Sequence, residues 1–282
     1  MASNFRSALW FPLFDELADP RVFVAVAEEA EAAGWDGVFV WDQIAWTAPV
    51  QSVADPWISL AAAANATERI RLGTMVTPLA RRRPVKLARE TASLDRLSGG
   101  RLILGVGLGS DAYAAEFSRT GEEVVDRVRA EMFDEALEVI GKCWSGQPVR
   151  HRGRHYTVHD IAFLPTPVQQ PRIPIWAAGR AGRAKPLNRA TRVDGFFPLG
   201  LQGPNQLAEI AATITRLRPD PTAPYDIAVE MPPAEDPAGY AAAGATWAMT
   251  EFDPETMTLD LVRGVLRDGP FRSTLRSEGR SR

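Results

Sequence analysis

Cysteine and histidine are scarce in this chain. Its 282 residues include one cysteine, Cys143, and three histidines. A single thiol excludes an internal disulfide framework and a thiolate metal cluster. Cys143 lies in a helical pattern beside Trp144, so we expect it to be buried and inert. His151, His155 and His159 recur every four residues, but in a strand-like stretch containing glycine, so no metal site is expected there.

Long apolar runs and an excess of one charge are also missing. The net charge of -3 gives no electrostatic footprint for nucleic acid, and the basic run 81–83 is expected to be a solvated helix start or an anion contact. No run of about eighteen apolar residues exists, so no membrane span is expected. The beginning of the chain, MASNFRSALWF, lacks a basic region before a long apolar stretch, so no signal peptide is expected. These absences predict a cytoplasmic protein without nucleic-acid or membrane partners.

What is present is ordinary globular composition, 45% hydrophobic and 24% charged. Eight strand-like segments alternate with helical ones, without a shift in composition, which predicts one domain over residues 1–282. That count favours a closed (β/α)8 TIM barrel over an open doubly wound sheet. Residues 147–172, rich in proline and aromatics, are expected to be a small inserted hairpin. The predicted strands are 7–11, 37–41, 70–77, 101–106, 173–177, 194–198, 225–231 and 244–250.

The stretch LDRLSGGRLILGVGLGS, residues 94–110, is the most informative segment. A helical end meets a Ser-Gly-Gly stop, and an apolar run typical of a parallel strand then leads into glycines. Gly105, Gly107 and Gly109 allow close approach to the backbone, either by a ligand or by packing at the strand end. Their G-x-G-x-G spacing is not the dinucleotide-binding pattern.

Active sites of such barrels lie at the carboxyl ends of the strands. The segments expected to converge there are Asp42-Gln43, Thr74-Met75, residues 107–111 and residues 177–185. Tryptophans near the strand ends, Trp10, Trp41 and Trp46, either pack in the core or line an apolar substrate pocket.

The chain resembles the bacterial luciferase-like monooxygenase family over nearly its whole length. The segments that carry the resemblance are RIRLGTMVTPLARRRPVKLARETASLDRLS, LDRLSGGRLILGVGLGS and IPIWAAGRAGRAKPLNRATRVDGFFP. The resemblance implies a TIM-barrel oxidoreductase that uses a flavin or a deazaflavin and is often a homodimer.

The resemblance also implies two cofactor contacts. It places a bulge at Thr74-Met75 against the isoalloxazine ring, in many deazaflavin relatives with a non-proline cis peptide; a plain packed strand end is the alternative. It makes the loop after the fifth strand a phosphate site, which basic side chains and free N–H groups at a helix start suit on chemical grounds. A solvated basic loop is the alternative there. In addition to the residues of the bulge, the cofactor-binding residues expected are Gly107, Ala177, Ala178, Gly179, Arg180, Arg183 and Lys185.

A third implication concerns the reactive part of the cofactor. Deazaflavin-dependent reductases of this family often carry Asp-His after the second strand, and their sugar-phosphate dehydrogenases add a glutamate after the fourth. Gln43 and Ser110 occupy those positions here. Glutamine exchanges no proton at neutral pH and serine is a poor unaided acid, so Asp42 remains as the ionisable candidate or merely orients loops.

The sequence therefore predicts a flavin-dependent monooxygenase that uses reduced FMN and O2 on a small organic substrate, with FMN supplied by a separate reductase or a free pool. An F420-dependent hydride-transfer reductase or dehydrogenase is the alternative with the same fold. A non-catalytic flavin-binding protein or partner subunit is the third hypothesis.

Overall fold

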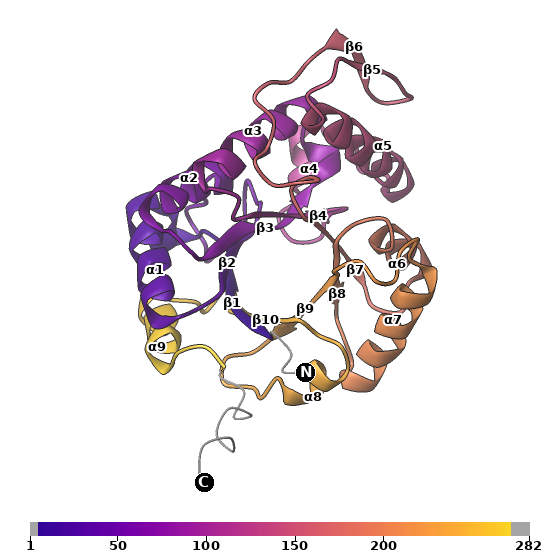
Figure 1. Ribbon diagram of the computed structural model, residues 1–282. Coiled ribbons are helices and arrows are strands. Elements are labelled where there is room, and N and C mark those ends of the chain that lie inside the picture. The colour runs from indigo at the N-terminus through magenta and orange to yellow at the C-terminus, as the bar shows by residue number, and fades with distance from the viewer. Residues whose placement is uncertain (1–4, 272–282) are drawn as a thin grey trace.

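The structure, a computed structural model, describes residues 5–271 and contains a closed barrel of eight parallel strands (Figure 1). The strands follow the order β1-β10-β9-β8-β7-β4-β3-β2 around the barrel, which confirms the predicted fold. Their bounds are β1 Arg6–Phe11, β2 Gly37–Val40, β3 Arg71–Pro78, β4 Leu102–Gly107, β7 Ile175–Arg180, β8 Gly195–Leu199, β9 Asp226–Met231 and β10 Trp247–Glu251.

Helices surround the barrel in Figure 1. Local sequence explains where the first ones begin: Asp19 and Asp55 cap helices that have proline at the first position, and their carboxylates accept N–H groups of the first turn at 2.9 Å. The bounds are α1 Pro20–Ala33, α2 Pro56–Ala66, α3 Pro84–Leu97, α4 Glu116–Thr120, α5 Asp126–Trp144, α6 Ala184–Ala190, α7 Pro204–Leu217, α8 Ala238–Ala242 and α9 Leu259–Asp268, with short 3-10 turns η1 Asp15–Ala18 and η2 Leu79–Arg81.

Two apolar cores result from the alternation of side chains along each strand. The larger lies between strands and helices, and the smaller fills the barrel interior. In the interior, Trp176 lies 5.5 Å from Phe39 and 5.4 Å from Trp247, measured between ring centroids. These aromatic rings fill the middle of the barrel. The interior residues are Ala8, Trp10, Phe39, Met75, Ile103, Trp176, Phe197, Ala228, Trp247 and Met249.

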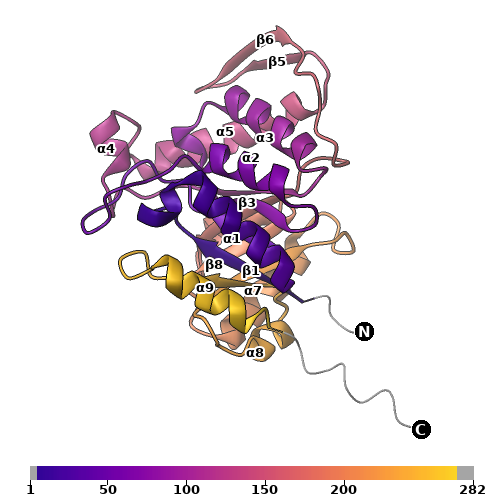
Figure 2. The ribbon, with the colours of Figure 1, turned by 90° about the vertical axis from the view of Figure 1, so that its left-hand side faces the viewer.

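The segment between α5 and β7 forms an antiparallel hairpin, β5 Val149–Arg152 and β6 Thr157–Ile161, which projects beyond α3 and α5 (Figure 2). His151 Nε2 lies 3.1 Å from Glu135 Oε1, and the N–H of His155 donates to the other oxygen of Glu135 at 2.9 Å. These histidine residues therefore attach the hairpin to α5. Cys143 is buried in the outer core, as expected, and burial raises the pKa of its thiol to about 11.

Candidate functional site at the carboxyl end of the barrel

Apolar side chains from five strands line the inner face of the barrel at its carboxyl end. Trp10 lies 5.5 Å from Trp41 and 5.0 Å from Phe197, between ring centroids. Partly buried side chains pack onto this interior cluster and leave part of their surface accessible. They are Trp41, Val76, Ala178 and Leu199, at the ends of β2, β3, β7 and β8. We call Trp10 and these four residues the apolar wall.

The aromatic surface continues beyond the wall. Trp46, in the loop after β2, lies 5.7 Å from Trp41 and stacks on Tyr113 with ring centroids 5.1 Å apart. Tyr113 comes from the loop after β4 and is 62% exposed. The structure thus brings the three predicted tryptophans together and adds Tyr113, which sequence reasoning missed.

The bulge in β3 differs in detail from the prediction. The strand register shifts between Thr74 and Thr77, and the non-proline cis peptide joins Met75 to Val76, one residue later than expected. Thr74 is fully buried, and its hydroxyl donates to the carbonyl of Gly105 at 3.3 Å. The extra residue of the bulge instead sends Met75 and Val76 toward the interior cluster. The side chain of Thr74 is thus occupied within the strand pair, and a ring contact at Thr74-Met75 stays a prediction.

The glycines of β4 are explained by this bulge. A Cβ on Gly105 would lie 2.2 Å from the carbonyl oxygen of Thr74, and one on Gly107 would lie 2.5 Å from Val76 Cγ2. Gly109 has φ +73° and no room beside Phe117. Packing of the protein against itself accounts for all three glycines, and a cofactor contact at Gly107 stays a prediction.

Asp42 is buried in a network of arginines. Thr77 Oγ1 and Arg82 Nε donate to Asp42 Oδ2 at 3.0 and 3.1 Å, and Arg81 donates to Oδ1 at 3.1 Å. Arg81 also donates to the Asp42 carbonyl. Burial alone would lower the pKa of Arg82, but the Asp42 carboxylate outweighs it and raises that pKa. The side chains of Arg81 and Arg82 are 5% and 20% exposed, so the expectation of a solvated helix start was wrong for both.

Gln43 pairs with a glutamate that sequence reasoning missed. With its amide nitrogen turned toward Glu116, Gln43 donates to both carboxylate oxygens, at 2.8 and 2.7 Å. The N–H groups of Ile44 and Ala45 donate to the same carboxylate at 2.5 and 2.9 Å. Glu116 begins α4 and is 4% exposed. Its signal in the sequence is a lone acid between small and aromatic residues, which indicates nothing about its partner.

Among the described residues, Ser110 makes no hydrogen bond to Gln43 or Glu116. Its side chain is exposed, and its Oγ accepts the N–H of Ala112 at 3.1 Å in a turn. Next to it, Asp111 accepts the N–H of Phe117 at 2.8 Å at the start of α4. In the structure Ser110 thus supports a loop.

Three exposed basic side chains lie between the end of β7 and the start of α6: Arg180, Arg183 and Lys185. Within residues 5–271 these three form no ion pair, and the N–H groups of Gly182 and Ala184 find no acceptor. Gly179 is required because a Cβ there would lie 2.2 Å from Pro186 Cβ. Ala177 packs in the outer core and Ala178 in the apolar wall. We call residues 180–185 the basic loop.

Two glutamates complete the carboxyl end, and sequence reasoning missed both. Glu230 follows the inward-facing Ala228 on β9, and Glu251 follows the inward-facing Met249 on β10. Burial raises the pKa of Glu230, against the effect of the Gly200 N–H, which donates to it at 2.8 Å. Because side chains alternate between the two faces of a strand, the sequence could have placed both glutamates on the inner face.

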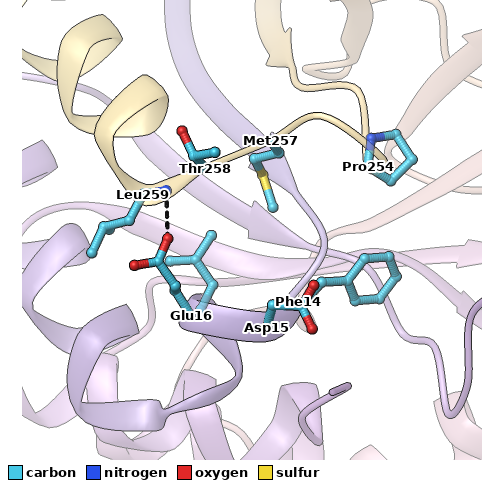
Figure 3. Close-up of a pocket in the computed structure, with 8 residues that line it drawn as sticks. Phe14, Asp15, Glu16, Pro254, Met257, Thr258 and Leu259 are labelled. Carbon is cyan, nitrogen blue, oxygen red and sulfur yellow. Dashed lines mark hydrogen bonds between the residues drawn. The ribbon is translucent and has the colours of Figure 1, made fainter. Parts of the chain in front are cut away.

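A small cavity lies beside this end of the barrel, between η1 and the segment before α9 (Figure 3). It measures about 30 Å³, room for roughly one water molecule. Glu16 Oε2 accepts the N–H of Leu259 at 3.3 Å across its edge (Figure 3). The cavity is too small for a ring system and is not a cofactor site.

Comparison with known proteins places the fold in a family. The family model described as luciferase-like monooxygenase matches residues 10–244. The chain belongs to the luciferase-like monooxygenase family.

Individual members of the family show how varied its named activities are. The chain is 34% identical to an F420-dependent glucose-6-phosphate dehydrogenase from Beutenbergia cavernae, over 80% of this chain and 68% of that protein. It is 28% identical to an uncharacterized protein from Mycobacterium tuberculosis, over 78% of this chain and 80% of that protein.

Solved structures share the fold at low identity. A monooxygenase from Streptomyces bottropensis gives a TM-score of 0.75 at 20% identity, covering 93% of this chain and 96% of that one. An F420-dependent secondary alcohol dehydrogenase gives 0.70 at 23%, covering 92% of this chain and 84% of that one. This luciferase-like chain is thus an oxidoreductase of a family whose members use flavins or F420. None of its described helices has the length and apolar character needed to cross a membrane.

Proposed function

We propose that this luciferase-like protein is an F420-dependent oxidoreductase that transfers hydride between a small organic substrate and the deazaflavin. The observation that carries the proposal is that the apolar wall and the exposed basic loop lie at the same end of the barrel. The similarity to F420-dependent glucose-6-phosphate dehydrogenases supports the deazaflavin over FMN.

The residues present fit such a cofactor. A deazaflavin has a flat apolar ring system and an anionic tail, which need an apolar surface and cations. Trp10, Trp41 and Val76 offer the surface, and Arg180 and Arg183 carry guanidinium groups that suit a phosphate. The side chain of Trp41 is only partly buried, so its ring keeps surface for contact with the cofactor ring.

When bound, the deazaflavin supplies a carbon that accepts or delivers hydride. The chain holds the ring against the apolar wall and excludes water around it. Asp42 is a positioning residue, because its carboxylate is occupied by Arg81, Arg82 and Thr77. Gln43 is held by Glu116, and its amide has no proton that titrates near neutral pH.

A monooxygenase using reduced FMN and O2 is the second candidate. The arrangement around Gln43 favours it, since neither Asp42 nor Glu116 is free to exchange a proton on the β2–β4 side of the site. Deazaflavins react poorly with oxygen, so oxygen dependence separates the two reactions.

Binding titrations of the purified chain with F420 and with FMN test the proposal. We expect F420 to bind more tightly, and R180A and R183A each to weaken its binding by roughly 10-fold or more, because a hydrogen bond to a charged group contributes about 1.5–3 kcal/mol. R216A, on the exposed face of α7, is the control and should bind like the parent chain. Preferential FMN binding with oxygen consumption would favour the second candidate. Binding of neither cofactor would overturn both.

A further inference from the structure

Asp42, Glu116, Glu230 and Glu251 are four of the carboxylates at or beside the carboxyl end of the barrel, and the first three accept hydrogen bonds. Asp42 is held by arginines and Glu116 by backbone N–H groups. Glu230 accepts the N–H of Gly200. Glu251 alone among these four has no hydrogen-bond donor within the described residues. Its oxygens are therefore available to a ligand.

The strand register places Glu251 on the inner face. Trp247 and Met249, which precede it on β10 by four and two residues, both belong to the interior cluster. Trp10 of the apolar wall is the ladder partner of Glu251 on β1. Glu251 is thus the next inward residue of β10, beside the surface proposed to hold the cofactor ring.

We propose that Glu251 is the residue that binds and deprotonates the substrate hydroxyl, and that the substrate is an uncharged or cationic alcohol. This inference rests on the proposed function. The O–H bond breaks, its proton moves to a carboxylate oxygen of Glu251, and the electron pair stays on the substrate oxygen to form a carbonyl. The carbon-bound hydrogen leaves with its electron pair to the oxidised deazaflavin, which is the oxidant. In the reverse direction Glu251 returns the proton.

The surroundings of Glu251 suit proton exchange near neutral pH. Burial, and then the charges of Glu230 and Asp253, raise the pKa of Glu251 to about 7. Glu230 faces it from β9 and Asp253 from the loop after β10, whereas β1 presents the uncharged Trp10. A base is most effective when its pKa lies near the working pH.

The same charges select the substrate. A phosphate or carboxylate on this side of the site would face Glu230 and Glu251, with no cation of the described residues paired to either. Like charges at close range in a half-buried site repel strongly. Hydroxyl or ammonium groups, in contrast, can donate to these oxygens.

A measurement without cofactor tests the carboxylate itself. In the full chain labelled with 13C at glutamate Cδ, the resonance missing from E251Q should titrate near pH 7 and should move when propan-2-ol, glycerol or glucose is added. Glycerol 3-phosphate and glucose 6-phosphate should move it at least 10-fold less at equal concentration. E209Q, an exposed substitution on α7, should leave this resonance in place. A resonance that titrates below pH 5, or that responds best to the phosphate esters, overturns the inference.

A second measurement uses the chain loaded with F420. The parent kcat/KM for alcohol oxidation should rise with pH through about 7, and E251Q should lose this inflection together with about 100-fold or more in rate. E251D keeps the carboxyl and should retain the inflection at a lower rate. An unchanged pH profile in E251Q overturns the inference. If F420 fails to bind, the proposed function fails, while the cofactor-free titration still reports on Glu251.

Discussion

At the scale of single residues, the candidate site contains two kinds of carboxylate. Asp42 and Glu116 are buried and saturated with donors, so they hold the loops after β2 and β4 in place. Glu230 and Glu251 face the barrel interior and keep part of their surface accessible. The first pair therefore builds the site; of the second pair, Glu230 accepts the N–H of Gly200, and Glu251 is available to act in the site.

The Asp42 network has a consequence for stability. Replacing Asp42 by Asn removes the nearer counter-ion of the buried Arg81 and leaves only Glu116, 3.9 Å away; breaking a buried pair typically costs about 3–5 kcal/mol. We expect urea denaturation to show a loss of this size for D42N. D19A, which removes an exposed helix cap, is the comparison and should lose about 1 kcal/mol. Equal losses in the two variants would mean that the network does not stabilise the fold.

Glu251 should also make stability depend on pH. Its pKa of about 7 in the folded state lies above the ordinary value of about 4.3, so the folded state binds this proton more tightly than the unfolded state. Its contribution is therefore fully present below about pH 4.3 and is lost as the pH rises through 7. Urea denaturation of the parent and E251Q from pH 5 to pH 8 should show the variant gaining relative stability over this window. A constant difference, as expected for E209Q, would contradict the shifted pKa.

At the scale of elements, β3 and β4 are shaped to fit each other. The bulge of β3 pushes Val76 against Gly107, and Thr74 against Gly105. This contact places Met75 and Val76 inside the barrel. The two strands pack closely because Gly105 and Gly107 of β4 have no side chains. The most specific sequence signal in the chain is thus a packing signal that indirectly shapes the apolar wall.

Gly107→Ala tests that fit. The new Cβ would lie 2.5 Å from Val76 Cγ2, and overpacking of this kind typically costs about 1–3 kcal/mol. The added substitution V76A should restore part of the loss, because it removes the clashing methyl group. Gly141→Ala in α5 is the matched control: its new Cβ would have no atom within 4 Å, and it should gain about 0.5–1 kcal/mol from helix propensity. Thermal unfolding of these variants and the parent measures the differences, and a G107A chain as stable as the parent would refute the packing explanation.

At the scale of the whole molecule, closure of the barrel brings together ends of strands that lie far apart in the chain. Trp10 from β1 and Glu251 from β10 become ladder partners only because the first and last strands pair. The aromatic interior fills the middle of the barrel, so chemistry is confined to its carboxyl end. A homodimer and a separate flavin reductase stay predictions.

The sequence by itself determined the alternation of strands and helices, the barrel and the family, since these depend on local periodicity and on glycine and proline positions repeated along the chain. It also indicated the basic loop and the tryptophans near the strand ends. Only the tertiary structure decided which polar groups are free. Asp42 is occupied because η2 brings Arg81 and Arg82 to it. Glu251 is available because strand pairing turns it inward beside Trp10, and no local pattern specifies the partners of a side chain across a closed barrel.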